Sequence, residues 1–131
     1  MNKKRKNITI FVDESGTLPD PKDSVVIIAA VGTKIPSRLR KINNEVRKYL
    51  KMKKTPEIKF YTAGDRTRKA YLKAISKENL EIFVLTVEKA GKKISDSPQN
   101  FALLCWFLLE DCLNLYHKNL KEVTFDRHFH H

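Results

Sequence analysis

Three short runs of apolar, often β-branched residues constrain the fold of this chain more than any other feature. They cover residues 8–12, 24–31 and 81–88, and each has the composition of a buried strand. The first run is apolar on both faces, which predicts a central position in a covered sheet. A polar loop joins the first run to the second, so a hairpin is the economical connection between them.

Two basic amphipathic helices are predicted in the middle of the chain. The first covers residues 37–54, where apolar residues recur at helical spacing, and it ends before Pro56. The second covers residues 65–77, with Asp65 as its N-cap. A short extended segment, residues 57–60, lies between these two helices. Both helices carry many lysines and arginines, so they are expected to expose a charged surface.

A long apolar segment follows the third strand run. Residues 99–116 are apolar on nearly all sides, and Ser97-Pro98 before them has the pattern of an N-cap and first helical residue. We therefore expect a helix buried by several neighbours. Residues 122–126 resemble a last strand. Strands that alternate with helices in this way predict an α/β domain, in which helices flank a mixed sheet.

The length and composition limit the class of protein. A chain of 131 residues predicts a single domain, here with residues 1–7 as a basic N-terminal tail. The longest apolar run, residues 101–109, is too short to cross a membrane, which requires about 20 residues. Cys105 and Cys112 lie in the apolar segment and are expected to be buried free thiols. No secretory signal is recognisable, so we expect a cytoplasmic protein without a membrane partner.

The positive charge is concentrated in the middle third of the chain. The formal net charge is +11, and residues 34–77 contribute +12, with 15 basic and 3 acidic residues. A localised basic field suits a polyanion such as nucleic acid, which is bound through its phosphates. The alternative interpretation is a lysine-rich helical surface that only faces solvent. The charge therefore favours nucleic acid as a partner without excluding the simpler explanation.

Residues on the second basic helix and just before it are predicted to contact nucleic acid. Arg66, Arg68 and Lys69 lie on the second basic helix and are expected to contact phosphates. Tyr61 precedes this helix and is the best candidate to stack on a base. The aromatic residues of the apolar helix lie among apolar neighbours, so core packing is the favoured interpretation for them.

Carboxylates flank several of the predicted strands. Asp13 and Asp126 end apolar strands, and Glu57 begins the short extended segment. Carboxylates at strand ends can meet at one edge of a sheet, where they would bind Mg²⁺ or Mn²⁺, which prefer oxygen ligands. Asp13 and Glu14 are adjacent, so in an extended strand they point to opposite faces. The alternative is structural, because a carboxylate after a strand often forms a turn or caps a helix.

Several motifs together resemble one known family. They are Phe11-Val12-Asp13-Glu14-Ser15-Gly16, Glu57-Ile58-Lys59-Phe60, Val87-Glu88-Lys89 and Val123-Thr124-Phe125-Asp126. In this order, and with the apolar helix before the last of them, they resemble the domain of unknown function 3800 family. That family is similar to ribonuclease H-like proteins in fold. The resemblance covers nearly all of the chain, and its first two motifs are the most specific.

The resemblance implies a nuclease-like site that uses Mg²⁺ or Mn²⁺. By motif position, Asp13, Glu57 and Asp126 would be the catalytic acids and metal ligands, and Glu14 an accessory metal ligand. Lys59 and Lys89 would contact a phosphate. The alternative for each lysine is a solvated pair with a nearby acid.

The chain departs from this family at its end. Members continue with further secondary structure and another acidic residue on a late helix, whereas this chain stops five residues after Asp126. We therefore expect a ribonuclease H-like fold that lacks its C-terminal part. The predicted function is metal-dependent cleavage of phosphodiester bonds in nucleic acid. The alternatives are a nucleic-acid-binding module without catalysis and a protein-interaction domain with an acidic partner.

Overall fold

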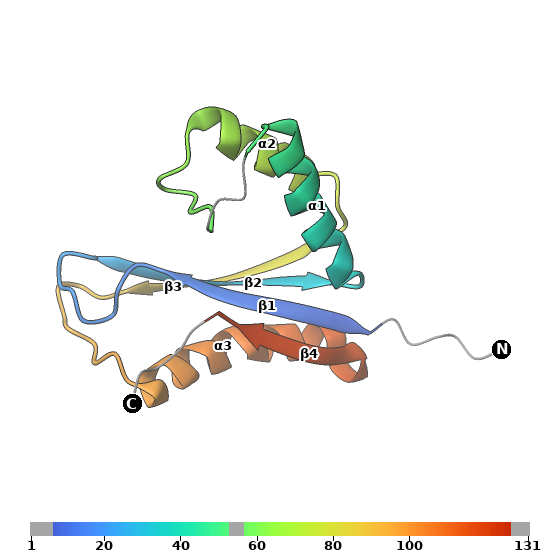
Figure 1. Cartoon of the computed structure of the whole chain (residues 1–131). Helices are drawn as coiled ribbons and strands as arrows, with labels where there is room; N and C mark the ends of the chain where they lie inside the picture. Colours follow the sequence, from blue (N-terminus) through green and yellow to red (C-terminus); the bar gives the residue numbers. More distant parts are fainter. Residues whose placement is uncertain (1–6, 53–56, 127–131) are drawn as a thin grey trace. The chain divides into compact units, whose positions relative to one another are not determined.

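The computed structural model describes residues 7–52 and 57–126, and the chain divides into two compact units (Figure 1). Unit 1 comprises Met1–Lys34 and Leu80–His131, and unit 2 comprises Ile35–Asn79. Unit 2 is thus an insertion in the sequence of unit 1. Of the predicted basic tail, residues 1–6 lie outside the described residues, and the expectation of a single domain stays a prediction.

Unit 1 contains a four-stranded mixed sheet in the order β3-β2-β1-β4. The strands are β1 (Ile8–Ser15), β2 (Val25–Thr33), β3 (Glu81–Glu88) and β4 (Leu120–Phe125). β1 and β2 form the predicted antiparallel hairpin, β3 pairs antiparallel with β2, and β4 pairs parallel with β1. The predicted central position of the first strand is confirmed, and so is the α/β class with a mixed sheet.

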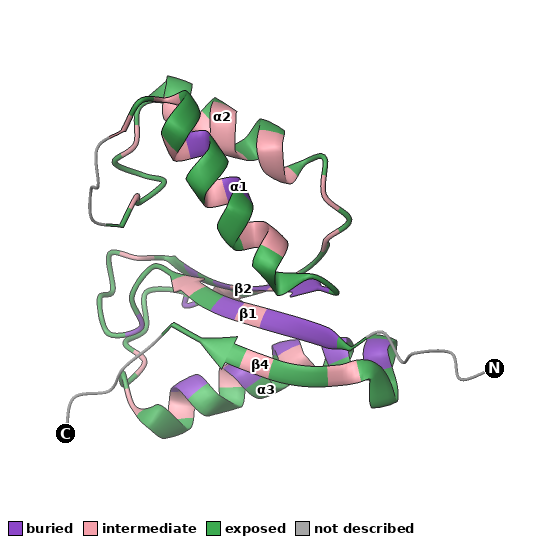
Figure 2. Ribbon diagram, turned by 45° about the vertical axis from the view of Figure 1, so that its right-hand side comes forward, coloured by how far each residue is buried: buried purple, intermediate pink, exposed green. Residues whose placement is uncertain are grey.

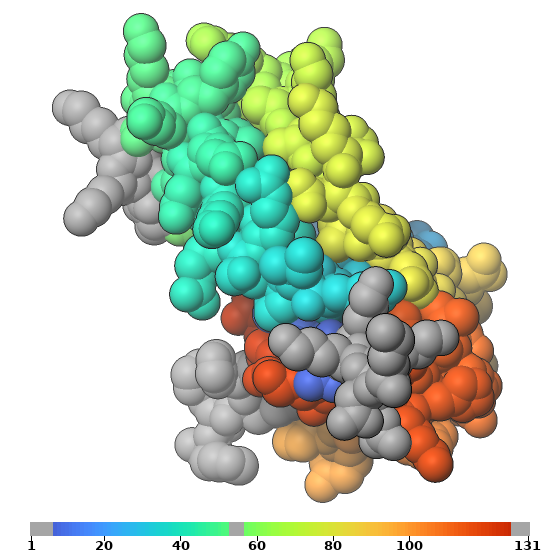
Figure 3. All heavy atoms as spheres, turned by 90° about the vertical axis from the view of Figure 1, so that its right-hand side faces the viewer, coloured from blue at the N-terminus to red at the C-terminus, as the bar shows by residue number. Residues whose placement is uncertain are grey.

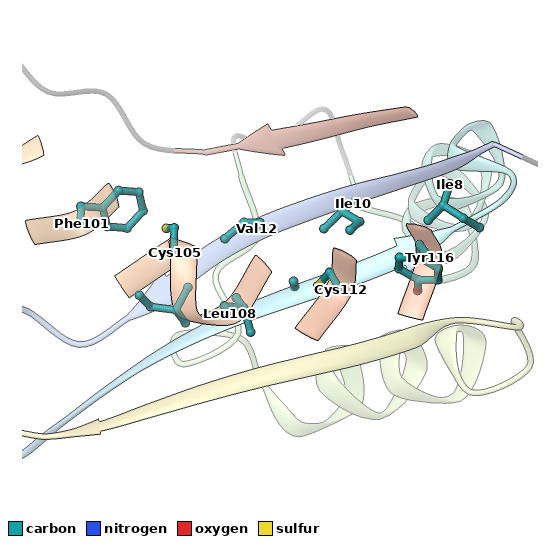
Figure 4. Close-up of a cluster of buried hydrophobic side chains, with 10 residues drawn as sticks. Ile8, Ile10, Val12, Phe101, Cys105, Leu108, Cys112 and Tyr116 are labelled. Atoms are coloured by element: carbon teal, nitrogen blue, oxygen red, sulfur yellow. The ribbon is translucent and has the colours of Figure 1, made fainter. Parts of the chain in front are cut away.

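One helix, α3 (Pro98–Tyr116), covers one face of this sheet (Figure 1). The Ser97 Oγ accepts a hydrogen bond from the Asn100 N–H at 3.1 Å, so the predicted N-cap is confirmed. β1 contributes the alternate residues Ile8, Ile10 and Val12 to the core. α3 contributes residues three or four positions apart, namely Phe101, Cys105, Leu108, Cys112 and Tyr116 (Figure 4).

The prediction that several neighbours bury α3 is wrong. Its outer side exposes large apolar residues, among them Leu103, Trp106 and Phe107, each more than half exposed. Figure 2 shows exposed stretches of α3 in green. The helix is apolar all round, but among the described residues the sheet packs against one side only.

None of the helices in residues 7–52 and 57–126 is long and apolar enough to span a membrane.

Unit 2 contains the helices α1 (Pro36–Tyr49) and α2 (Asp65–Ile75). Both are shorter than predicted. α1 ends at Tyr49, well before the predicted Pro56, because Lys51 adopts a positive φ of 54°, which a continuing helix does not allow. Pro56 itself lies outside the described residues. Gly64 rather than Asp65 occupies the N-cap position of α2.

The two helices of unit 2 share a small core and a few polar contacts. Ile42 and Val46 are buried on α1, and the Tyr71 hydroxyl of α2 donates a hydrogen bond to the Asn43 Oδ1 at 2.6 Å. The predicted extended segment at residues 57–60 is not a strand, because residues 57–59 have no regular structure and a turn begins at residue 60. The sheet therefore gains no fifth strand from this segment.

Cys105 and Cys112 are buried and free, as predicted. Burial raises the pKa of the Cys112 thiol from 9.0 to about 11, and the charge of Asp111 adds to the increase. Above pH 9 the unfolded chain loses a thiol proton that the folded chain keeps. We therefore expect the free energy of unfolding to decline between about pH 9 and 11.

Urea unfolding at a series of pH values measures this decline. The Cys112→Ala variant, whatever its stability at pH 7, should lose less stability than the parent over the same pH interval. An identical slope in both proteins would show that Cys112 is not the titrating group.

Candidate functional site

Asp13 and Asp126 lie side by side on neighbouring strands. In the parallel register of β1 and β4, Phe11 lies opposite Thr124 and Val12 opposite Phe125. The Asp126 N–H donates to the Val12 carbonyl oxygen at 3.3 Å, so the pairing continues to the position beside Asp13. Adjacent strands are roughly 5 Å apart, and residues in register point to the same face. The structure thus brings two of the predicted acids together.

These two acids line a pocket of about 230 Å³. It lies on the sheet face opposite α3, and its lining includes Phe11, Ala29 and Thr124 besides the two acids. Both acids are exposed to solvent. The Asp13 Oδ1 accepts a hydrogen bond from the Glu14 N–H at 2.9 Å, which fixes one side of that carboxylate. The pocket therefore combines hard oxygen donors with an apolar floor.

The other two predicted acids are placed differently. β1 continues through Ser15, so Glu14 points to the face that α3 covers, away from the Asp13 side chain. The prediction of Glu14 as a metal ligand beside Asp13 is therefore not supported by its position. Glu57 is exposed and belongs to unit 2, and its role stays a prediction. Within residues 7–52 and 57–126, no three His, Cys, Asp or Glu residues form a metal-binding group.

Lys89 is buried and holds a loop, in contrast to its predicted role at a phosphate. It is only 2% exposed, and its Nζ donates hydrogen bonds to the carbonyl oxygens of Thr17, Leu18 and Asp20 at 2.6, 3.1 and 2.5 Å. The ammonium group therefore holds the loop between β1 and β2. The prediction that Lys89 contacts a phosphate is not compatible with this buried arrangement.

The same loop is fixed by Asp23. Its Oδ2 accepts hydrogen bonds from the N–H and the hydroxyl of Thr17, both at 2.8 Å. These hydrogen bonds lower the pKa of Asp23, because they favour the charged carboxylate. Gly16 allows the chain to enter the loop with a φ of 91°. The segment after Asp13 is therefore ordered by internal hydrogen bonds.

Unit 2 carries a basic groove between α1 and α2. The groove has a volume of about 680 Å³. Four basic residues recur every three or four positions along α2 and just beyond it, and they line one side: Arg66, Lys69, Lys73 and Lys77. Figure 3 shows side chains of this unit in turquoise, green and yellow at the molecular surface. Two predicted residues, Arg66 and Lys69, thus lie in one groove.

Lys73, Lys77 and Tyr49 are groove residues that the predicted site did not include. The spacing that joins the two lysines to Arg66 and Lys69 is visible in the sequence, since residues three or four apart share a helix face. Tyr49 is 68% exposed, and its ring lies 6.0 Å from the Arg66 guanidinium carbon. No sequence signal indicates this contact, because it joins two separate helices.

Arg68 points away from the groove and stabilises the preceding turn. Its Nε donates to the Phe60 carbonyl oxygen at 2.8 Å, and its Nη2 donates to the Tyr61 carbonyl oxygen at 2.7 Å. The guanidinium also lies 5.3 Å from the Phe60 ring centre. Arg68 therefore positions a turn on which Tyr61 is 77% exposed. Lys59 precedes this turn and is also exposed.

The charge of the chain follows the division into units. Ile35–Asn79 contains 14 basic and 4 acidic residues, a net charge of +10. Two of the acids, Glu45 and Glu78, form ion pairs with Arg38 at 3.2 and 3.0 Å. These contacts raise the pKa of Arg38, with Glu78 contributing most. The remaining +1 belongs to unit 1, so nearly all of the net positive charge lies in unit 2.

The two units therefore carry features of different chemistry. Asp13 and Asp126 present oxygen ligands on the sheet of unit 1, and the α1–α2 groove presents cations in unit 2. Comparison of the chain with protein-family models, curated proteins and solved structures gave no match.

Proposed function

We propose that the chain cleaves phosphodiester bonds in nucleic acid with Mg²⁺ or Mn²⁺ held by Asp13 and Asp126. The observation that carries this proposal is the position of the two carboxylates, in register on neighbouring parallel strands and pointing to one face. Unit 2, with its net charge of +10, would hold the phosphate backbone.

The two carboxylates fit the ligand chemistry of Mg²⁺. This ion is commonly held by one or two carboxylates, while waters and substrate phosphates fill its other positions. A bound divalent cation would supply Lewis-acid polarisation of the phosphate and lower the pKa of a coordinated water. The side chains of Asp13 and Asp126 would orient the ion on the sheet face. Glu57 is the proposed third acid, as the family resemblance implies.

The mixed α/β architecture is compatible with a ribonuclease H-like fold. We infer a ribonuclease H-like arrangement from the mixed sheet, the hairpin that begins it, and the acidic residues Asp13 within β1 and Asp126 directly after β4. In this proposal the family resemblance implies the roles of Asp13 and Asp126, and the strand register brings the two residues close together.

Cleavage assays test the proposal directly. The purified protein is incubated with single-stranded and double-stranded DNA, RNA and DNA–RNA hybrids, with Mn²⁺, Mg²⁺ or EDTA. We expect metal-dependent cleavage of at least one substrate, and we expect Asp13→Asn or Asp126→Asn to reduce the rate at least about 100-fold. Glu122→Gln is the matched control, because Glu122 is an exposed acid on the same face of β4, opposite Thr9 at the far end of the pairing. Cleavage of no substrate, or undiminished cleavage by Asp13→Asn, would refute the catalytic proposal.

Thermal stability provides a second measurement of the metal site. An ion that binds only the folded chain adds about 2.7 kcal/mol at 100 times its Kd. Mn²⁺ should therefore raise the Tm of the parent and of Glu122→Gln. It should leave the Tm of Asp13→Asn nearly unchanged. Equal shifts in all three proteins would place the bound ion elsewhere.

A nucleic-acid-binding module without catalysis is the second candidate. It is favoured by the finding that no group of three potential ligands is assembled within the described residues. In that case binding weakens steeply with salt, no substrate is cleaved, and Asp13→Asn binds as tightly as the parent.

A further inference from the structure

We propose that the α1–α2 groove binds single-stranded nucleic acid, with a base on its apolar floor and the phosphates along its basic rim. This inference rests on the proposed function only in taking nucleic acid as the partner. It adds a preference for single strands and assigns that preference to one groove.

The groove separates charge from apolar surface in the way a nucleotide requires. Its rim carries the four cations Arg66, Lys69, Lys73 and Lys77. Val46 contributes to its floor from α1, and Ala70 and Ala74 contribute from α2. The two alanines lie four positions apart, between the cations, and their small side chains leave room beside the buried Val46. A volume of about 680 Å³ is within the range of small-ligand sites.

An exposed aromatic ring lies beside this floor. Tyr49 is 68% exposed and lines the groove together with Arg66, whose guanidinium carbon is 6.0 Å from the ring centre. Aromatic rings and arginine planes both stack on unpaired bases. Glu45 is the one acid among the lining residues, and its ion pair with Arg38 offsets its charge. The net field at the rim is therefore positive.

This arrangement favours an unpaired strand over a duplex. In a duplex the bases are stacked and paired, so a surface groove reaches only the phosphates and the base edges. In a single strand the base faces are accessible, and stacking adds to the phosphate contacts. The apolar floor contributes to affinity only when a base can enter it.

The place of unit 2 in the chain supports a dedicated binding role. β2 and β3 are antiparallel neighbours, which a turn of two residues can connect. Instead, Ile35–Asn79 is inserted between them, and this insertion contains nearly all of the net charge. A connection of this length and charge is not needed to form the sheet.

Fluorescence anisotropy in EDTA tests the inference without any contribution from metal. The probes are fluorescein-labelled single-stranded DNA, single-stranded RNA of the same sequence, and the corresponding DNA duplex. We expect at least about tenfold tighter binding of a single strand than of the duplex, from stacking of unpaired bases. Inorganic polyphosphate, which has charge but no bases, should compete less well than an unlabelled strand of equal charge.

Three variants separate charge from base binding. Lys69→Glu/Lys73→Glu should weaken single-strand binding at least about tenfold. The control Arg40→Glu/Lys48→Glu has the same charge change at exposed α1 residues outside the groove lining, and it should lose only about twofold to threefold. Ala74→Leu keeps the charge but fills the floor, and it should lose about fivefold or more for single strands and little for the duplex.

Tyr49→Ala keeps the test decisive if Ala74→Leu folds poorly, because Tyr49 is mostly exposed. It should also weaken single-strand binding about fivefold or more. Equal affinity for strand and duplex, or floor variants that bind like the parent, would overturn the inference. Cleavage with equal binding of single strands and duplex would leave the proposed function intact and reject this inference. Tighter binding of single strands with no cleavage would support this inference and reject the proposed function.

Discussion

Replacing Lys89 with methionine is expected to lower the free energy of unfolding by about 3 kcal/mol. Methionine keeps most of the aliphatic volume but removes the ammonium that donates to three carbonyl oxygens of the β1–β2 loop. Because Lys89 is 2% exposed, water replaces these donors poorly. For a chain of this size the Tm should fall by about 10 °C.

Urea and thermal unfolding measure the loss, and Lys92→Met is the matched control. Lys92 is exposed, and its backbone N–H donates to the Lys89 carbonyl oxygen, a hydrogen bond that the substitution keeps. Hydrogen exchange should locate the effect in the loop, where the Ile94 N–H donates to the Leu18 carbonyl oxygen. If Lys89→Met and Lys92→Met have equal stability, the carbonyl contacts contribute nothing measurable.

Lys89 illustrates what sequence could and could not predict here. The strands β1, β2 and β3 were predictable, because their apolar runs have few alternatives. The position of a lysine after a strand was not, since exposed and buried lysines have the same sequence signature. Its partners are carbonyl oxygens about 70 residues earlier in the chain, which carry no residue-specific information.

The candidate site was predictable to the extent that it depends on strand ends. Asp13 and Asp126 follow apolar runs, and the parallel register brings them together. The side of the sheet to which Glu14 points was not predictable, because it depends on whether β1 continues through Ser15. The extent to which α3 is covered was also unpredictable, because an apolar sequence shows that burial is favourable but not which surface provides it.

The second large effect is expected at Gly32, near the end of the interior strand β2. A Cβ at this position would overlap the Tyr116 hydroxyl oxygen and lie 3.0 Å from Cζ of the same ring. The ring is confined by the core and by an edge contact with Phe83, with centroids 5.8 Å apart. Gly32→Ala should therefore destabilise the protein by about 3 kcal/mol, although alanine favours strands more than glycine does.

A double-mutant cycle with Tyr116→Phe identifies the cause. The Tyr116 hydroxyl is buried and makes no hydrogen bond of standard geometry within the described residues. Burial raises its pKa most, and a weaker polar interaction with the Glu81 carboxylate raises it further. Because a buried hydroxyl without a partner is unfavourable, Tyr116→Phe alone should be neutral or stabilise the chain by up to about 1 kcal/mol. In the Gly32→Ala background the same change removes the shortest contact and should restore about 1–2 kcal/mol. Additive effects in urea unfolding would show that the glycine is required for a reason other than the approach of Tyr116.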